Sequence, residues 1–158
     1  MGLCLATGET MQRGFTYLTL LFFVAILAAG LSAVAVSWHT QQQRAREAEL
    51  IWAGTEIRNA IALYYNRSPV IREYPKNLED LLKDPRYGNM QRYLRQVYRD
   101  PMIGTNHWGI VEDPSGAIMG VYSLSKDKPI RKSGFAEDIK SFEEAKTYQD
   151  WKFVYSPQ

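Results

Sequence analysis

The sequence predicts an α+β fold in which one long N-terminal helix packs on a small antiparallel sheet of about three or four strands. Residues 15–36 form an apolar run of 22 residues without a charge, and no proline follows it until Pro69. The last third of the chain instead contains short apolar and aromatic segments separated by turn residues, which is typical of strands. A helix followed by strands indicates segregated α and β elements.

The apolar run, residues 15–36, is long enough to cross a bilayer. At a rise of about 1.5 Å per residue it covers a hydrocarbon core of about 30 Å. Trp38 follows it directly, at the place where an indole ring is expected to lie in the membrane interface. The sequence therefore predicts a single transmembrane helix.

Residues 37–66 predict an amphipathic continuation of the same helix. Its Gln, Arg, Ala and Glu residues are good helix formers. Its apolar residues recur at steps of three or four, the spacing of a stripe that packs on a core: Leu50, Ala53, Ile57, Ile61 and Tyr64. The helix should end near Asn66, because the residue before Pro69 disfavours helical backbone angles.

Residues 67–158 predict a globular head. Asn77 is a plausible N-cap for a short helix over residues 77–84. A second short helix is expected from residue 89 through residue 97, ending at Asp100-Pro101. A hairpin is expected from strands 108–112 and 117–124, with Pro114 and Gly116 favouring a type I turn. Residues 138–148 predict a short polar helix or loop, and residues 150–155 a third strand.

The composition argues against nucleic-acid binding and gives little support to disulfide chemistry. The 19 basic and 17 acidic residues leave a formal net charge of +2, without a basic stripe. The single cysteine, Cys4, lies ahead of the apolar run.

No residue pattern predicts a catalytic or metal site, so we do not expect an enzyme. His39 and His107 have no cysteine or carboxylate at metal-ligand spacing, and surface positions are expected for both. Glu112 and Asp113 are expected to shape the turn beside Pro114. Three arginines are expected to be solvated or to contact another subunit, and three aromatic residues to belong to the core; these are Arg92, Arg95 and Arg99, and Trp151, Phe153 and Tyr155.

The start of the apolar run carries the most specific motif. A small residue, Gly14, precedes the run instead of following it as in a secretory signal. Gly14, Phe15 and a long apolar helix resemble the type III signal of type IV prepilins and type II secretion pseudopilins. The resemblance implies a leader over residues 1–14, cleavage after Gly14 by a prepilin peptidase, and methylation of Phe15.

The head resembles that of G-type pseudopilins in the order of its landmarks. Tyr74-Pro75, Asp100-Pro101 and Trp108-Gly109 come in the family's order, as does the segment 121–124. The resemblance implies a pilin-like fold. Calcium is possible in the loop after residue 125, as in that family, but Asp127 is the single acid of residues 126–129, so no cofactor is expected.

Thr19 departs from the family pattern, which usually has Glu at this position, thought to pair with the N-terminus of a neighbouring subunit. A threonine has no charge to neutralise that amine, so the departure favours a minor or tip-proximal subunit. The absence of the family's proline at Val36 implies a straighter helix.

The resemblance implies a structural subunit of a type II secretion system or type IV pilus-like machine. Such a protein sits in the bacterial inner membrane with a cytoplasmic N-terminus and a periplasmic head, and assembles into a periplasmic fibre. Its expected partners are other pseudopilins or pilins, the prepilin peptidase, an inner-membrane assembly platform and membrane lipid. The alternative is a singly anchored periplasmic protein that binds a ligand or partner and does not polymerise.

Overall fold

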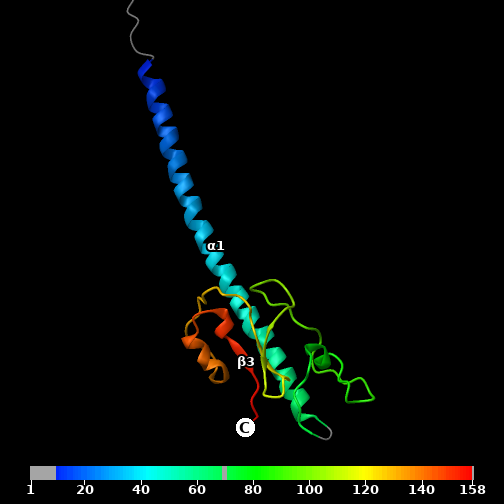
Figure 1. The fold of residues 1–158 in the computed structure, drawn as a ribbon. Helices are drawn as coiled ribbons and strands as arrows, with labels where there is room; N and C mark the ends of the chain where they lie inside the picture. Colours follow the sequence, from blue (N-terminus) through cyan, green and yellow to red (C-terminus); the bar gives the residue numbers. More distant parts are fainter. Residues whose placement is uncertain (1–9, 69–70, 158) are drawn as a thin grey trace, which may run out of the picture. The chain divides into compact units, whose positions relative to one another are not determined.

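A computed structural model of the chain describes residues 10–68 and 71–157, with the side chains of residues 10–14 and 29–37 left out (Figure 1). The chain divides into two compact units, Met1–Gln42 and Gln43–Gln158. The boundary between them falls within one helix, so the second unit includes the C-terminal part of that helix.

The secondary structure confirms an α+β fold with a small antiparallel sheet. Helix α1 (Thr10–Asn66) is followed by the 3₁₀ segment η1 (Leu78–Leu81) and the strands β1 (Gly109–Glu112) and β2 (Ile118–Tyr122). The 3₁₀ segments η2 (Glu137–Glu144) and η3 (Tyr148–Asp150) precede the strand β3 (Lys152–Val154). The strands lie in the order β1-β2-β3, and both pairs are antiparallel.

Helix α1 ends where the sequence predicts and begins earlier. Its last residue is Asn66, three residues before Pro69. Its first residue is Thr10 instead of Phe15, because Met11, Gln12 and Arg13 are themselves good helix formers.

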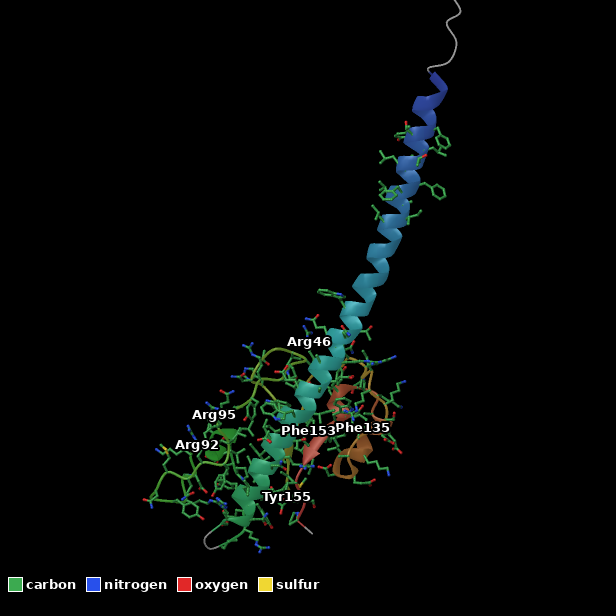
Figure 2. The ribbon with its side chains drawn as sticks, turned by 180° about the vertical axis from the view of Figure 1, so that it is seen from behind. Arg46, Arg92, Arg95, Phe135, Phe153 and Tyr155 are labelled. Atoms are coloured by element: carbon green, nitrogen blue, oxygen red, sulfur yellow. The ribbon has the colours of Figure 1, made fainter. Side chains whose placement is uncertain are left out.

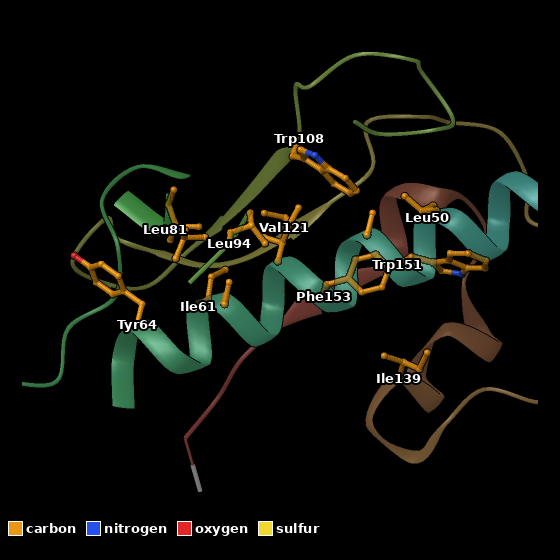
Figure 3. Packing of buried hydrophobic residues seen from close by; sticks show 14 of the residues in the cluster. Leu50, Ile61, Tyr64, Leu81, Leu94, Trp108, Val121, Ile139, Trp151 and Phe153 are labelled. Carbon is orange, nitrogen blue, oxygen red and sulfur yellow. The ribbon is translucent and has the colours of Figure 1, made fainter. Parts of the chain in front are cut away.

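The core of the second unit lies between α1 and the sheet. All five residues of the predicted stripe are buried, and Ile57 and Ile61 are fully inaccessible. Figure 3 shows the cluster along the helix, with Tyr64 at the end near Leu81 and Leu50 at the end near Trp151. Gly54 lets the ring of Phe153 approach the helix backbone so closely that any side chain at this position would overlap the ring.

The predicted hairpin and third strand are confirmed. Ile110 pairs with Val121 across β1 and β2, and Val121 pairs with Phe153 across β2 and β3. The turn is closed by a hydrogen bond from the Gly116 amide to the Asp113 carbonyl, 3.0 Å long. Gly116 has a φ of +80°, which glycine adopts without strain.

Of the two predicted short helices before the sheet, the first is shorter than expected and the second is wrong. Asn77 is the N-cap of η1 as predicted, but η1 is a 3₁₀ segment that ends at Leu81, and residues 89–97 contain no helix. The reason is that their backbone groups pair with distant partners: Tyr93 and Leu94 donate to the Leu81 carbonyl, at 2.9 and 3.0 Å. Residues 138–148 are predicted as a short polar helix or a loop, and most of them belong to the short helix η2.

Candidate functional site

The candidate processing and assembly residues lie in the first unit. Gly14 lies within α1, while residues 1–9, which include Cys4 and most of the predicted leader, are outside the described part of the chain. Phe15 is 75 % exposed. The hydroxyl of Thr19 donates a 2.8 Å hydrogen bond to the Phe15 carbonyl one turn earlier, so it is satisfied by its own helix.

The first unit exposes a large apolar surface. From residue 15 to residue 27 the large apolar side chains are all at least half exposed; they are Phe15, Tyr17, Leu18, Leu20, Leu21, Phe22, Phe23, Val24, Ile26 and Leu27. They lie on every side of the helix, a pattern that needs an apolar environment. Within the described residues, no helical stretch combines the length and the apolarity needed to cross a bilayer. Residues 29–36 of the predicted span lie outside the described side chains.

In the second unit, a buried carboxylate holds a loop against α1. Glu47 is 2 % exposed and accepts hydrogen bonds from the backbone amides of Ile130, at 2.6 Å, and Arg131, at 3.2 Å. The hydroxyl of Tyr148 donates to the same carboxylate at 2.9 Å. Gln43, one turn earlier, donates to the Lys128 carbonyl at 3.3 Å. The contacts of Ile130, Arg131 and Lys128 fix this loop on the helix, and the Tyr148 bond fastens η3 to the same carboxylate.

Tyr148 is protonated at any ordinary pH and so keeps its role as donor. Burial raises the pKa of Tyr148 to about 12; the bond that Gln43 donates to its oxygen opposes this, and the Glu47 carboxylate reinforces it. The sequence analysis missed this group. The sequence feature that could have revealed it is the position of Glu47. This acid lies three residues before Leu50 on the buried stripe, where an apolar residue is expected.

The loop that corresponds to the possible calcium site uses its oxygens for protein hydrogen bonds. The Asp127 carboxylate accepts a bond from the Ser125 hydroxyl at 3.1 Å, and the Asp127 carbonyl accepts one from the Tyr148 amide at 3.1 Å. Calcium needs six to eight oxygen ligands. Among the described residues, no group of three His, Cys, Asp or Glu side chains could hold a metal ion.

Replacing Glu47 with alanine is expected to lower the free energy of unfolding by about 1–3 kcal/mol, because two amides and a hydroxyl lose their acceptor. Amide exchange at Ile130 and Arg131 should rise. The exposed Glu49, two residues later, is the matched control, and its alanine variant should leave both readings unchanged.

Chelation with EDTA should not shift the melting midpoint of the wild type, whereas a clear fall would indicate a cation near Asp127.

A second buried network ties the loop after η1 to α1. Asp84 is buried and binds the Arg86 guanidinium, with Oδ2 2.7 Å from Nη2 and Oδ1 2.9 Å from Nε. The Arg86 guanidinium carbon lies 3.5 Å from the ring centre of Tyr64, and Nη2 donates to the Tyr64 carbonyl at 2.8 Å. Burial alone would raise the pKa of Asp84, but the hydrogen bonds from Arg86 outweigh this and hold it below 3.8.

The remaining polar candidates have structural roles or lie in solvent. The Asp113 carboxylate accepts bonds from the Ser115 amide, at 3.0 Å, and the Ala117 amide, at 2.8 Å, as its predicted turn role requires. Figure 2 shows Arg92 and Arg95 on the loop between η1 and β1. Five of the predicted surface residues are exposed, namely His39, Arg92, Arg95, Arg99 and His107.

The aromatic residues predicted for the core lie there to different degrees. Trp151 and Phe153 are fully buried. Tyr155 is only half-buried, and its hydroxyl accepts a 2.9 Å bond from the Asn66 side chain at the end of α1.

No protein-family model, curated protein or solved structure matches this chain.

Proposed function

We propose that the chain is a pseudopilin or pilin-like structural subunit. It is anchored in the inner membrane by residues 15–36, processed after Gly14, and carries a periplasmic head that assembles with other subunits into a fibre. The role is mechanical and supports protein export or pilus function. The observation that carries the proposal is the Gly14-Phe15 junction, placed directly before an uncharged apolar run of 22 residues.

The organisation of α1 supports this proposal. One helix provides both an apolar segment with exposed side chains and, from Gln43 onward, the central element of a folded unit. A pilin-like subunit needs both properties, because its helix serves for membrane storage and packing in the fibre as well as for the core of the head. The helix Thr10–Asn66 is continuous through both parts.

The buried polar groups of the second unit support a mechanical role over catalysis. Glu47 and Asp84 each bind groups that fasten a loop to α1. Asp100 is likewise fully buried, and its carboxylate binds the Ser123 hydroxyl at 2.7 Å and the Met102 amide at 2.8 Å. Each carboxylate is occupied by internal donors, which is the arrangement of a structural group.

The test is co-expression with a prepilin peptidase, followed by intact-mass and N-terminal analysis. The wild type should lose residues 1–14 and start with a methylated Phe15. Gly14→Leu should leave an uncleaved precursor, because the peptidase must accept a small residue before the helix. Gly30→Leu, the same substitution inside the apolar run, is the matched control and should be processed normally.

Two results would overturn the proposal or part of it. A mature mass for Gly14→Leu equal to that of the wild type would refute the cleavage site. A wild type that keeps Met1 in the presence of an active peptidase would favour the alternative, an anchored binding protein that does not polymerise.

A further inference from the structure

A cluster of cationic side chains lies at the end of the second unit where Gln43 begins. We call it the basic face; it consists of Arg44, Lys128, Arg131 and Lys132. All four residues are exposed. They come from two segments that are more than 80 residues apart in the sequence, so their assembly depends on the fold.

The Glu47 contacts bring these two segments together. The Ile130 and Arg131 amides bind Glu47, and the Lys128 carbonyl binds Gln43. Residues 128–132 therefore lie beside the turn of α1 that carries Arg44. A hollow of about 380 Å³ is lined there by three of the cations together with Ala48, Ile130, Ser133 and Glu47; the three are Arg44, Arg131 and Lys132.

Among the described residues, no ion pair neutralises the positive charge of this face. The ion pairs among the described residues are Arg58–Asp138, Arg86–Asp84 and Lys140–Glu137, so none of them involves the basic face. Glu47 directs its charge at backbone amides. The neighbouring exposed acid is Asp127, which is bound to Ser125. Four cations against these two carboxylates leave an excess of positive charge.

The Arg131 guanidinium is held in position without an acidic partner among the residues that the structure describes. Its guanidinium donates to the carbonyls of Ser133, at 3.3 Å, and Gly134. The guanidinium carbon also lies 4.7 Å from the ring centre of Phe135. These contacts fix the cation at the surface but leave its charge available to an external anion.

We propose that the basic face binds the anionic headgroups of phospholipids at the membrane surface. The occupant follows from charge and from sequence distance: Arg44 comes only eight residues after Val36, the last residue of the apolar run. Basic side chains next to a membrane segment are attracted to anionic lipid, and arginine binds phosphate oxygens in pairs. The inference rests on the membrane anchor of the proposed function, but not on cleavage or polymerisation.

The test uses the full chain in lipid nanodiscs, with one chain per disc, and compares two compositions. One disc contains only phosphatidylcholine, and the other contains phosphatidylcholine and phosphatidylglycerol in a ratio of about 7:3, so that its surface is anionic. Hydrogen exchange of residues 128–134 should be slower in the anionic disc. Each lysine at such a surface favours the bound arrangement about fivefold, and about 0.5 M salt should abolish the difference by screening.

The decisive variant is Lys128→Glu with Lys132→Glu, which should lose the difference between the two compositions. Arg92→Glu with Arg95→Glu reverses the same number of exposed charges elsewhere in the unit and should keep it. Both variants should keep the melting midpoint of the wild type, because all four substituted residues are exposed and the bond to Lys128 uses its backbone carbonyl.

Equal exchange in both discs, or equal loss in both double variants, would overturn the proposal. Protection that appears only with two chains per disc would assign the face to contact between copies and would also overturn it. A chain that does not insert into either disc would refute the membrane anchor itself, so that failure is distinct from a failure of lipid recognition.

Discussion

The substitution Asp84→Asn is expected to lower the free energy of unfolding by about 3–5 kcal/mol, the usual cost of breaking a buried ion pair from one side. The Asp84 side chain is 0 % exposed, and the charge of Arg86 would remain between Tyr64 and an uncharged amide. Arg86 is also bonded to the backbone of α1, so the loop after η1 should loosen as well. Chemical unfolding of a fragment spanning residues 39–158 measures the effect.

The matched control is Asp138→Asn. Asp138 also pairs with an arginine, Arg58, but its side chain is 48 % exposed, and exposed pairs contribute about 0–1 kcal/mol. Equal losses in the two variants would contradict the role assigned to the buried pair.

The effect of Asp84 should depend on pH with a defined sign. Its pKa in the folded protein lies below the ordinary value of 3.8, so the stabilisation is complete above that value and is lost as the pH falls toward the folded pKa. The gap in unfolding free energy between wild type and Asp84→Asn should therefore be constant near neutral pH and shrink below about pH 4. A gap that widens in acid would contradict the assignment.

The second large effect is expected for Ile57→Ala, which should cost about 2–5 kcal/mol in the same fragment. Ile57 is fully buried, and the removed atoms would leave a cavity between α1 and the sheet. Leu63→Ala is the control on the same helix, because Leu63 is 43 % exposed and its truncation should cost less than about 1 kcal/mol. An unchanged midpoint for Ile57→Ala would place the stripe against other subunits instead of the sheet.

The parts of the fold that follow from local pattern were predictable from the sequence. The stripe from Leu50 to Tyr64 has the helical period, and Pro114 with Gly116 marks the hairpin turn. The segment 89–97 was not predictable in this way, because its backbone pairs with Leu81 and its apolar residues pack on the core. Its helical spacing was therefore overridden by tertiary contacts.

The candidate sites divide along the same line. A local motif identifies the processing and assembly residues, because they lie close together within residues 14–19: Gly14, Phe15 and Thr19. The Glu47 contacts and the basic face depend on residues more than 80 positions apart, and no local pattern reports such a pairing. A lone acid on an apolar stripe is the one visible sign, because a buried carboxylate requires partners from elsewhere in the chain.

The close approach of Phe153 to Gly54 has a consequence for synthesis. About 100 residues separate these partners, and Tyr148 follows Glu47 by 101. At a ribosomal rate of about 5–20 residues per second, the apolar side of α1 emerges roughly 5–20 s before the aromatic residues that cover it. During that interval the nascent helix exposes an apolar surface to which chaperones and other chains can bind. The core of the head can form only after β3 has been synthesised.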